Sequence, residues 1–172
     1  AGGSYTRSRR DALPGAPDVG GPSRGQPRLM VDMAQARGMR HRKDASLVSI
    51  RSWPEFIGET SGYSYIKPKG EIAGARWGHA GSDATHMEDF HNPDGTMRSA
   101  DDIAAMWKSW NILPTQQVSF YCGTGWRASE TFMYARAMGW QNVSVYDGGW
   151  YEWSADPKNP VVTGERKPDS TL

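Results

Sequence analysis

Cys122 is the only cysteine in this chain of 172 residues, and its surroundings indicate a reactive sulfur. It follows an apolar run at 118–121 and precedes a helical pattern. At such a junction the unpaired N–H groups and the positive end of the helix dipole favour a thiolate. The alternative is a buried, inert cysteine, the usual state of a free thiol. The loop between the two elements favours the reactive form, because its two glycines let successive amides turn inward and form a nest for an anion. The candidate anion-binding residues are Gly123, Thr124, Gly125, Trp126 and Arg127.

Two side chains of this loop and one that follows an earlier strand have two interpretations each. Arg127 could bind the oxygens of an anionic substrate, or it could be the first solvated residue of the helix; we favour the substrate role. Trp126 could wall a pocket and exclude water, or cap the core. Arg51 follows an earlier apolar run. It could add positive potential at the pocket mouth or form a structural ion pair, and we favour the ion pair.

Metal and nucleic-acid chemistry are not expected. The histidines and carboxylates between 79 and 91 follow no compact ligand pattern, and charged loop residues are usually solvated. Three aromatic residues could stack bases, but no basic stripe accompanies them, so we expect Tyr63, Tyr65 and Trp77 to cover the core. We therefore expect no metal, no organic cofactor and no nucleic-acid partner.

Short strands and helices alternate along the chain and must position Cys122. Strands are expected at 47–50, 118–121 and 143–146, where apolar residues predominate. Helices are expected at 29–39, after Ser99 as N-cap, and at 128–138, which Gly139 closes at the C′ position. Residues 58–95 give no clear pattern. The alternation predicts an α/β domain, with a mostly parallel central sheet, helices on both faces, and Cys122 at the carboxyl end of a strand, where ligands bind.

Residues 1–30 differ from the rest of the chain. They hold six Gly, four Pro and five Arg with few apolar side chains, which predicts a flexible linker or arm. Residues 31–172 are expected to form a single catalytic domain. The arm carries five Arg against two Asp, whereas the remainder carries 15 basic and 17 acidic residues. The basic pI thus belongs to the arm, which argues against a nucleic-acid surface on the domain.

No apolar run approaches the ~20 residues of a membrane span, so we expect a soluble protein without a membrane partner. A single cysteine excludes an internal disulfide, and periplasm and cytoplasm therefore both stay open. The sequence begins at Ala1 without an initiator Met, which predicts a trimmed chain from which any targeting segment has been removed. If further modules precede this one, they join at residues 1–30.

The loop from Cys122 to Arg127 resembles the six-residue active-site loop of the rhodanese sulfurtransferases. Other motifs stand at matching distances: residues 47–52, the turn at 70–75, residues 94–96, and the motif at 146–150. The resemblance runs from about residue 47 to about residue 164. It is closest to the C-terminal catalytic module of multi-domain bacterial thiosulfate and 3-mercaptopyruvate sulfurtransferases. Two positions depart from the family, since Ser49 replaces its usual Asp and Glu71 its usual His.

The resemblance implies a rhodanese-like fold and sulfur transfer through a persulfide on Cys122. The thiolate would attack the outer sulfur of a small anionic donor such as thiosulfate, release sulfite and pass the sulfur to a thiophilic acceptor. Amides of residues 123–127 would stabilise the persulfide as an oxyanion hole does. The loop is one residue shorter than that of the cysteine-dependent phosphatases, and the smaller ring suits one sulfur atom better than a phosphate.

Two alternatives to a thiosulfate sulfurtransferase stay open. A 3-mercaptopyruvate sulfurtransferase has a similar loop, but usually a small hydroxyl residue where Arg127 stands, and arginine favours the inorganic dianion. The other alternative is a persulfide-relay module that delivers sulfur to a partner protein. In that case residues 58–95 and the basic arm would supply the docking surface.

Overall fold

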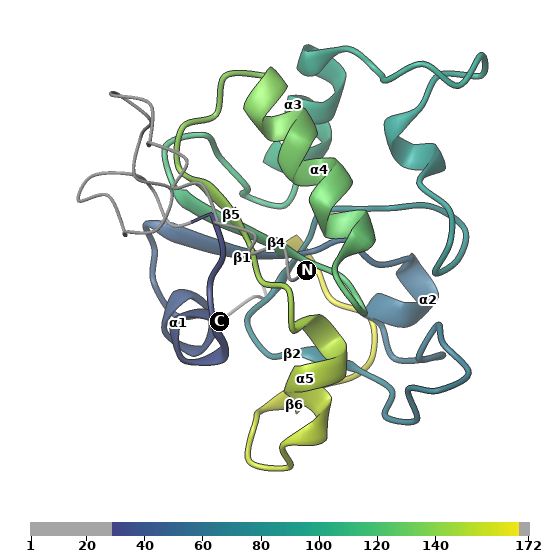
Figure 1. Ribbon diagram of the computed structural model, residues 1–172, viewed down its shortest axis with the longest axis vertical. Helices are drawn as coiled ribbons and strands as arrows, with labels where there is room; N and C mark the ends of the chain where they lie inside the picture. Colours follow the sequence, from purple (N-terminus) through teal and green to yellow (C-terminus); the bar gives the residue numbers. More distant parts are fainter. Residues whose placement is uncertain (1–28, 169–172) are drawn as a thin grey trace, which may run out of the picture.

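The computed structural model describes residues 29–168, and its centre is a four-stranded sheet of order β3-β1-β4-β5 (Figure 1). All three strand pairings in this sheet are parallel, which confirms the predicted sheet type. Its strands are β1 (Ala45–Ser49), β3 (Arg76–Trp77), β4 (Gln117–Tyr121) and β5 (Val143–Val145). A separate antiparallel pair joins β2 (Glu71–Ile72) to β6 (Val161–Val162).

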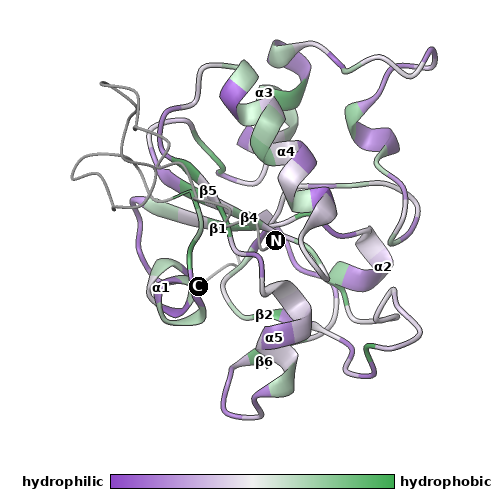
Figure 2. Cartoon of the chain, in the orientation of Figure 1, coloured by the Kyte–Doolittle hydropathy of each residue, from purple (hydrophilic) through white to green (hydrophobic). Residues whose placement is uncertain are grey.

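Helices cover both faces of the central sheet, as the sequence predicts (Figure 1). Side chains alternate between the faces along a strand, so Val48 packs into one hydrophobic cluster and Leu47 into the other. The Val48 cluster lies beneath α2 (Trp53–Phe56), α3 (Ala100–Lys108) and α4 (Trp126–Ala137). The Leu47 cluster lies beneath α1 (Met33–Met39) and α5 (Gly149–Ala155). The hydrophobic colouring of Figure 2 accordingly concentrates on the central strands.

The first helix and the domain boundary differ from the prediction for residues 29–39. Helix α1 begins only at Met33, because the Asp32 carboxylate accepts a hydrogen bond from the Gln35 amide and caps the helix there. Leu29 and Met30 instead pair with β5, where the carbonyl of Leu29 accepts from the amide of Val145 at 2.9 Å. These two residues therefore belong to the domain and not to the arm. Residues 1–28, the rest of the predicted arm, lie outside the described residues.

Helices α3 and α4 follow their predicted signals closely. The Ser99 side chain accepts a hydrogen bond from the Asp102 amide and starts α3, as expected from its N-cap pattern. Helix α4 begins at Trp126, two residues before the predicted start, and so takes Trp126 and Arg127 into its first turn. Gly139 follows its end with φ +87°, the left-handed conformation that closes helices. The loop before α4 is consequently short.

The segment at 58–95, for which the sequence gives no clear pattern, contains β2, β3 and a 3₁₀ turn, η1 (Glu88–Phe90). Just before it stands the one-turn helix α2, which was not predicted. Its signal was present, since Ser52 precedes Glu55 by three positions and the Ser52 amide and hydroxyl both donate to that carboxylate. Among the helices of residues 29–168, none has the length and apolar character needed to cross a membrane.

Candidate active site

The sulfur of Cys122 lies directly after β4 and below the N-terminus of α4. The amide of Gly125, which has φ +104°, donates a hydrogen bond to Sγ at 3.1 Å. Within residues 29–168, no protein acceptor receives a hydrogen bond from the other amides at this helix start: Gly123, Thr124, Trp126 and Arg127. Unpaired amides at a helix N-terminus carry a partial positive charge, so the loop has the electrostatics of an anion nest.

The start of helix α5 supports the loop from behind. The Trp150 amide donates to the carbonyl of Cys122 at 2.9 Å, and the Tyr151 amide donates to the carbonyl of Gly123 at 3.1 Å. Gly149, with φ +55°, precedes both donors, and a Cβ there would overlap the Cys122 carbonyl. The Gly148-Gly149-Trp150 sequence therefore lets two backbones approach closely and fixes where the carbonyls of the loop point.

Cys122 has no exposed surface, and Tyr63 packs against the loop next to it. A Cβ on Gly123 would overlap the Tyr63 ring, so the ring rests directly on that glycine. Burial raises the pKa of Tyr63, and the nearby charge of Cys122 adds to this effect although Arg127 opposes it. The phenol is therefore protonated near neutral pH. Tyr63 packs against the Leu47 cluster, as expected of a residue that covers the core, and it also lies at the candidate active site.

Arg127 is fully buried and binds the Glu55 carboxylate through two hydrogen bonds of 2.9 and 3.0 Å. Its guanidinium also donates to the Tyr63 hydroxyl at 3.0 Å and to the Asp83 carbonyl at 3.4 Å. The alternative of a solvated helix residue is therefore wrong. Burial by itself would lower the pKa of Arg127, but the hydrogen bonds and charge of Glu55 outweigh it and raise the pKa. Burial likewise opposes ionisation of Glu55, yet Arg127 holds its pKa below the usual range.

Arg51 is a structural residue. It has no exposed surface, donates to the carbonyl of Gly70 at 2.7 Å, and forms an ion pair with Glu71 at 3.2 Å. Its Nε lies 3.5 Å from Glu55, the same carboxylate that holds Arg127. These contacts correspond to the favoured ion-pair interpretation, and a side chain without exposed surface does not form a pocket mouth.

The two positions that depart from the family pattern contact each other. The Ser49 hydroxyl donates to a carboxylate oxygen of Glu71 at 2.7 Å. The other oxygen accepts from the hydroxyl of Tyr121, whose pKa burial and this carboxylate raise well above its usual value. The two residues thus belong to one buried network beneath the sheet's carboxyl end, and Arg51 compensates the charge of Glu71 there.

The remaining loop side chains and the histidines lie apart from this buried network. Thr124 is exposed, and Trp126 is 46% exposed, so Trp126 does not cap the core. Each histidine between 79 and 91 pairs with a different acid: His79 with Asp89, His86 with Asp83 and His91 with Glu130. In the described part of the chain, no three His, Cys, Asp or Glu side chains are grouped to hold a metal ion.

Sequence reasoning missed Glu55 and Tyr63 as residues of the site. Glu55 had a local signal, its position three residues after Ser52 in a capping box. Its partner Arg127, however, lies 72 positions away along the chain. Tyr63 stands in a Gly, Ser and Tyr stretch that marks no element and no motif. Nothing in one sequence indicates that its ring rests on Gly123.

A model of the rhodanese-like domain matches residues 32–156, and the chain belongs to this family. Thiosulfate sulfurtransferase YnjE of Escherichia coli is 85% identical over 155 residues, which are 90% of this chain and 36% of that protein. The chain therefore spans about a third of the length of this relative.

Solved structures show the same fold. The crystal structure of YnjE superposes with a TM-score of 0.84 at 87% identity, over 86% of this chain and 36% of that one. An anaerobic ergothioneine biosynthesis enzyme from Chlorobium limicola, in complex with its natural substrate trimethyl histidine, has a TM-score of 0.78 at 50% identity. It is matched over 80% of this chain and 32% of that one. A sulfur carrier protein of Thermus thermophilus, TtuD, is 30% identical over 70% of this chain and 42% of that protein.

Proposed function

We propose that the chain transfers sulfur from thiosulfate to a thiophilic acceptor through a persulfide on Cys122. The observation that carries this proposal is the hydrogen bond from the Gly125 amide to Sγ, at a helix start whose neighbouring amides have no protein acceptor. The 85% identity to thiosulfate sulfurtransferase YnjE supports thiosulfate as the donor. A thiolate and a persulfide both place negative charge where those amides lie.

The donor step is a displacement at sulfur. The Cys122 thiolate attacks the outer sulfur of thiosulfate, a new S–S bond forms, and the donor's S–S bond breaks. The electron pair of that bond leaves with sulfite, so no external oxidant or proton is required. The loop amides stabilise the charge on the transferred sulfur, and covalent storage splits the overall transfer into two easier steps.

Arg127 contributes to this chemistry by positioning. Its two terminal nitrogens donate to Glu55, Tyr63 and Asp83, and its Nε is buried without a partner among the described residues, so we assign donor binding to the amides of Gly123, Thr124, Gly125 and Trp126. Arg127 fixes the first turn of α4 and the Tyr63 hydroxyl relative to Cys122. Its charge is compensated by Glu55 and adds little net attraction for an anion.

Intact mass spectrometry tests the proposed function directly. Brief exposure to thiosulfate should add about 32 Da, the mass of one sulfur atom, and cyanide should remove it. Because Cys122 is the only cysteine, any added sulfur is assigned without ambiguity. Cys122→Ser should retain the fold and gain no mass. Sulfur loading or turnover by Cys122→Ser, or no loading of the unchanged chain, would overturn the proposal.

Two donors are distinguished by steady-state kinetics. We expect a higher kcat/KM for thiosulfate than for 3-mercaptopyruvate, because the chain is 85% identical to thiosulfate sulfurtransferase YnjE. A large advantage for mercaptopyruvate would reassign the donor and leave the Cys122 persulfide in place.

Two other acceptors are supported by relatives. TtuD is a sulfur carrier protein at 30% identity, which favours a protein acceptor; a mixed disulfide trapped with a partner would support that relay. A structure of EanB at 49% identity holds a cysteine persulfide together with ergothioneine, which favours an imidazole acceptor. Incubation of the loaded chain with trimethyl histidine tests this second candidate. A trimethyl histidine product heavier by one sulfur supports an imidazole acceptor. If no such product forms while cyanide still removes the sulfur from the loaded chain, the loading is intact and the imidazole acceptor is wrong.

A further inference from the structure

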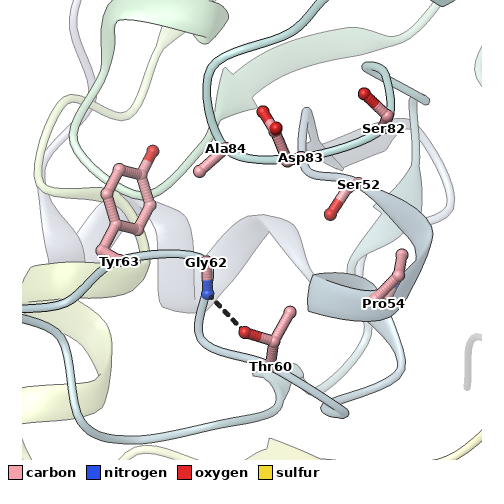
Figure 3. A pocket seen from close by; sticks show the side chains of 8 residues that line it. All are labelled: Ser52, Pro54, Thr60, Gly62, Tyr63, Ser82, Asp83 and Ala84. Atoms are coloured by element: carbon pink, nitrogen blue, oxygen red, sulfur yellow. Dashed lines mark hydrogen bonds between the residues drawn. The ribbon is translucent and has the colours of Figure 1, made fainter.

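A pocket of about 340 Å³ lies beside the candidate active site, next to α2 (Figure 3). Figure 3 shows Tyr63 at one side and Ser52 at the other, with Ser82 and Asp83 on the segment that crosses above them. Hydroxyl groups predominate among its polar side chains. Its walls come from three segments that are distant from β4 in the sequence, so no active-site motif includes them.

The pocket is in contact with the loop of Cys122 through two of its lining residues. The Tyr63 ring lines the pocket and also rests on Gly123. The carbonyl of Asp83, another lining residue, accepts a hydrogen bond from Arg127. Tyr63 is therefore the partition between this pocket and the residue next to Cys122.

The charge of the pocket is negative. Asp83 is the one ionisable acid among its lining residues, and no lysine, arginine or histidine lines it. The hydrogen bond from His86 lowers the pKa of Asp83 to about 2, so the carboxylate is charged at neutral pH. All the side-chain hydrogen bonds described for Asp83 go to Oδ1, from Thr85 and His86, which leaves Oδ2 for a ligand. A dianionic donor is repelled here, whereas a cation is attracted.

We propose that this pocket is the acceptor subsite and that it selects small thiols carrying an ammonium group. The proposal rests on the proposed function, because it assigns the second half of the same reaction. The ammonium group binds Asp83 Oδ2, and the thiolate reaches Cys122 when the Tyr63 ring moves off Gly123. Donor and acceptor thus use sites of opposite character, the amide nest for the anion and the Asp83 side for the cation.

The acceptor step balances without any further reactant. The acceptor thiolate attacks the outer sulfur of the Cys122 persulfide and forms a new S–S bond. The S–S bond to Cys122 breaks, and its electron pair returns to Cys122 as the thiolate. The acceptor leaves as a persulfide, and the chain is ready for another donor.

The test measures single-turnover discharge of chain already loaded with sulfur and freed of thiosulfate. Cysteamine, 2-mercaptoethanol and 3-mercaptopropionate are compared at equal thiolate concentration, since they differ mainly in charge. Cysteamine should discharge the persulfide faster than the neutral 2-mercaptoethanol by roughly fivefold, about the effect of one charge a few ångströms away in water, and 3-mercaptopropionate should be slower than both. Equal rates, or a faster anionic thiol, would overturn the proposal.

Two variants with opposite expected effects sharpen the test. Asp83→Asn removes the charge but keeps an oxygen for the Thr85 amide, and should abolish the preference for cysteamine. His86→Gln removes the partner that partly neutralises Asp83, and should increase the preference. The matched control is Asp101→Asn, which removes the same charge from an exposed position of α3 and should leave the preference unchanged.

The outcomes separate this inference from the proposed function. If the unchanged chain never gains sulfur, the Cys122 persulfide itself is wrong. If it loads normally but Asp83→Asn keeps the full preference for cysteamine, the persulfide stands and the acceptor subsite is wrong. An equal loss of preference in Asp101→Asn would likewise assign the effect to overall charge and overturn the subsite.

Discussion

Arg127 lies where a substrate-binding arginine was expected, yet the hydrogen bonds that its guanidinium donates all go to the protein itself. Its charge and that of Glu55 are both without exposed surface, so each is tolerated only because of the other. At the scale of single residues, Arg127 therefore connects Glu55, Tyr63 and Asp83 to the first turn of α4.

Arg127→Ala should lower the free energy of unfolding by about 3–5 kcal/mol, because it leaves Glu55 buried without its bidentate partner. Urea denaturation measures this loss. Arg136→Ala is the matched control on the same helix, since the exposed Arg136 donates only to the carbonyl of Gln141 and should cost less than about 1 kcal/mol. Unchanged stability together with a raised KM for thiosulfate would instead return Arg127 to donor binding.

In the exposed pair of Asp83 and His86, the pKa of the acid should lie below its usual range and the pKa of the imidazole above it. Their hydrogen bond lowers the pKa of Asp83 to about 2 and raises the pKa of His86. The stabilisation from His86 is complete below about pH 6.5 and is lost as the pH rises through the raised pKa. That from Asp83 is present above about pH 3.9 and is lost as the pH falls toward about 2.

An NMR titration of the His86 imidazole checks this prediction. The unchanged chain should show a midpoint above about 6.5, and Asp83→Asn should return it close to that reference value. Asp101→Asn, which removes the same charge from an exposed position of α3, is the control and should leave the His86 midpoint as it is in the unchanged chain. A His86 midpoint that is the same in both proteins contradicts the pair.

At the scale of elements, the active-site loop depends on two helices that do different things. The amide of Gly125, the N-cap of α4, donates to Sγ, whereas the amides of Trp150 and Tyr151 at the start of α5 donate to the loop carbonyls of Cys122 and Gly123. One amide of the loop thus donates to the sulfur, while two of its carbonyls accept hydrogen bonds from α5. Neither glycine before Trp150 has room for a side chain: a Cβ on Gly149 would overlap the Cys122 carbonyl, and one on Gly148 the Glu152 side chain.

Gly149→Ala should displace the loop and slow persulfide formation, because the new Cβ would overlap the Cys122 carbonyl. The expected loss of stability is about 1–3 kcal/mol, from backbone strain and from the contact. Gly139→Ala is the matched control: Gly139 also has a positive φ, but a Cβ there meets nothing within 4 Å. It should reduce stability without affecting the rate of sulfur loading, which mass spectrometry follows. Equal loading rates in both variants would contradict the support that we assign to α5.

At the scale of the whole molecule, one parallel sheet separates two hydrophobic clusters. Trp107 lies on one side and Trp153 on the other, both without exposed surface. Each indole N–H donates to a loop carbonyl, Trp107 to Gly78 at 3.0 Å and Trp153 to Pro160 at 3.1 Å. Because neighbouring residues of β1 belong to different clusters, the two sides are expected to unfold together.

Trp107→Phe and Trp153→Phe should each lower the same unfolding transition by about 1–3 kcal/mol, through lost packing and an unpaired carbonyl. Urea unfolding followed by both far-UV circular dichroism and fluorescence measures the transition. The two probes should coincide in both variants. Transitions that separate in either variant would show that the clusters are independent.

The sequence predicted the parts of this molecule that depend on neighbours along the chain. The residues before Cys122 form a strand and those after Gly125 a helix because apolar runs, glycines and caps act locally. The start of α4 was placed two residues late because Gly125, not Arg127, ends the loop. The pairing of Glu55 with Arg127 spans 72 positions, and the contact of Tyr63 with Gly123 depends on the folded chain. Contacts between residues so far apart in the chain cannot be predicted from the pattern of neighbouring residues.

Full burial of the Cys122 side chain has a consequence for the lifetime of this atom. Oxidation of a thiolate by peroxide requires contact with the sulfur, and irreversible sulfinic and sulfonic acids form most readily at accessible sites. Because Cys122 has no exposed surface in this conformation, its sulfur should be protected from peroxide. The same burial that a sulfur donor must overcome would therefore also protect Cys122 against irreversible oxidation.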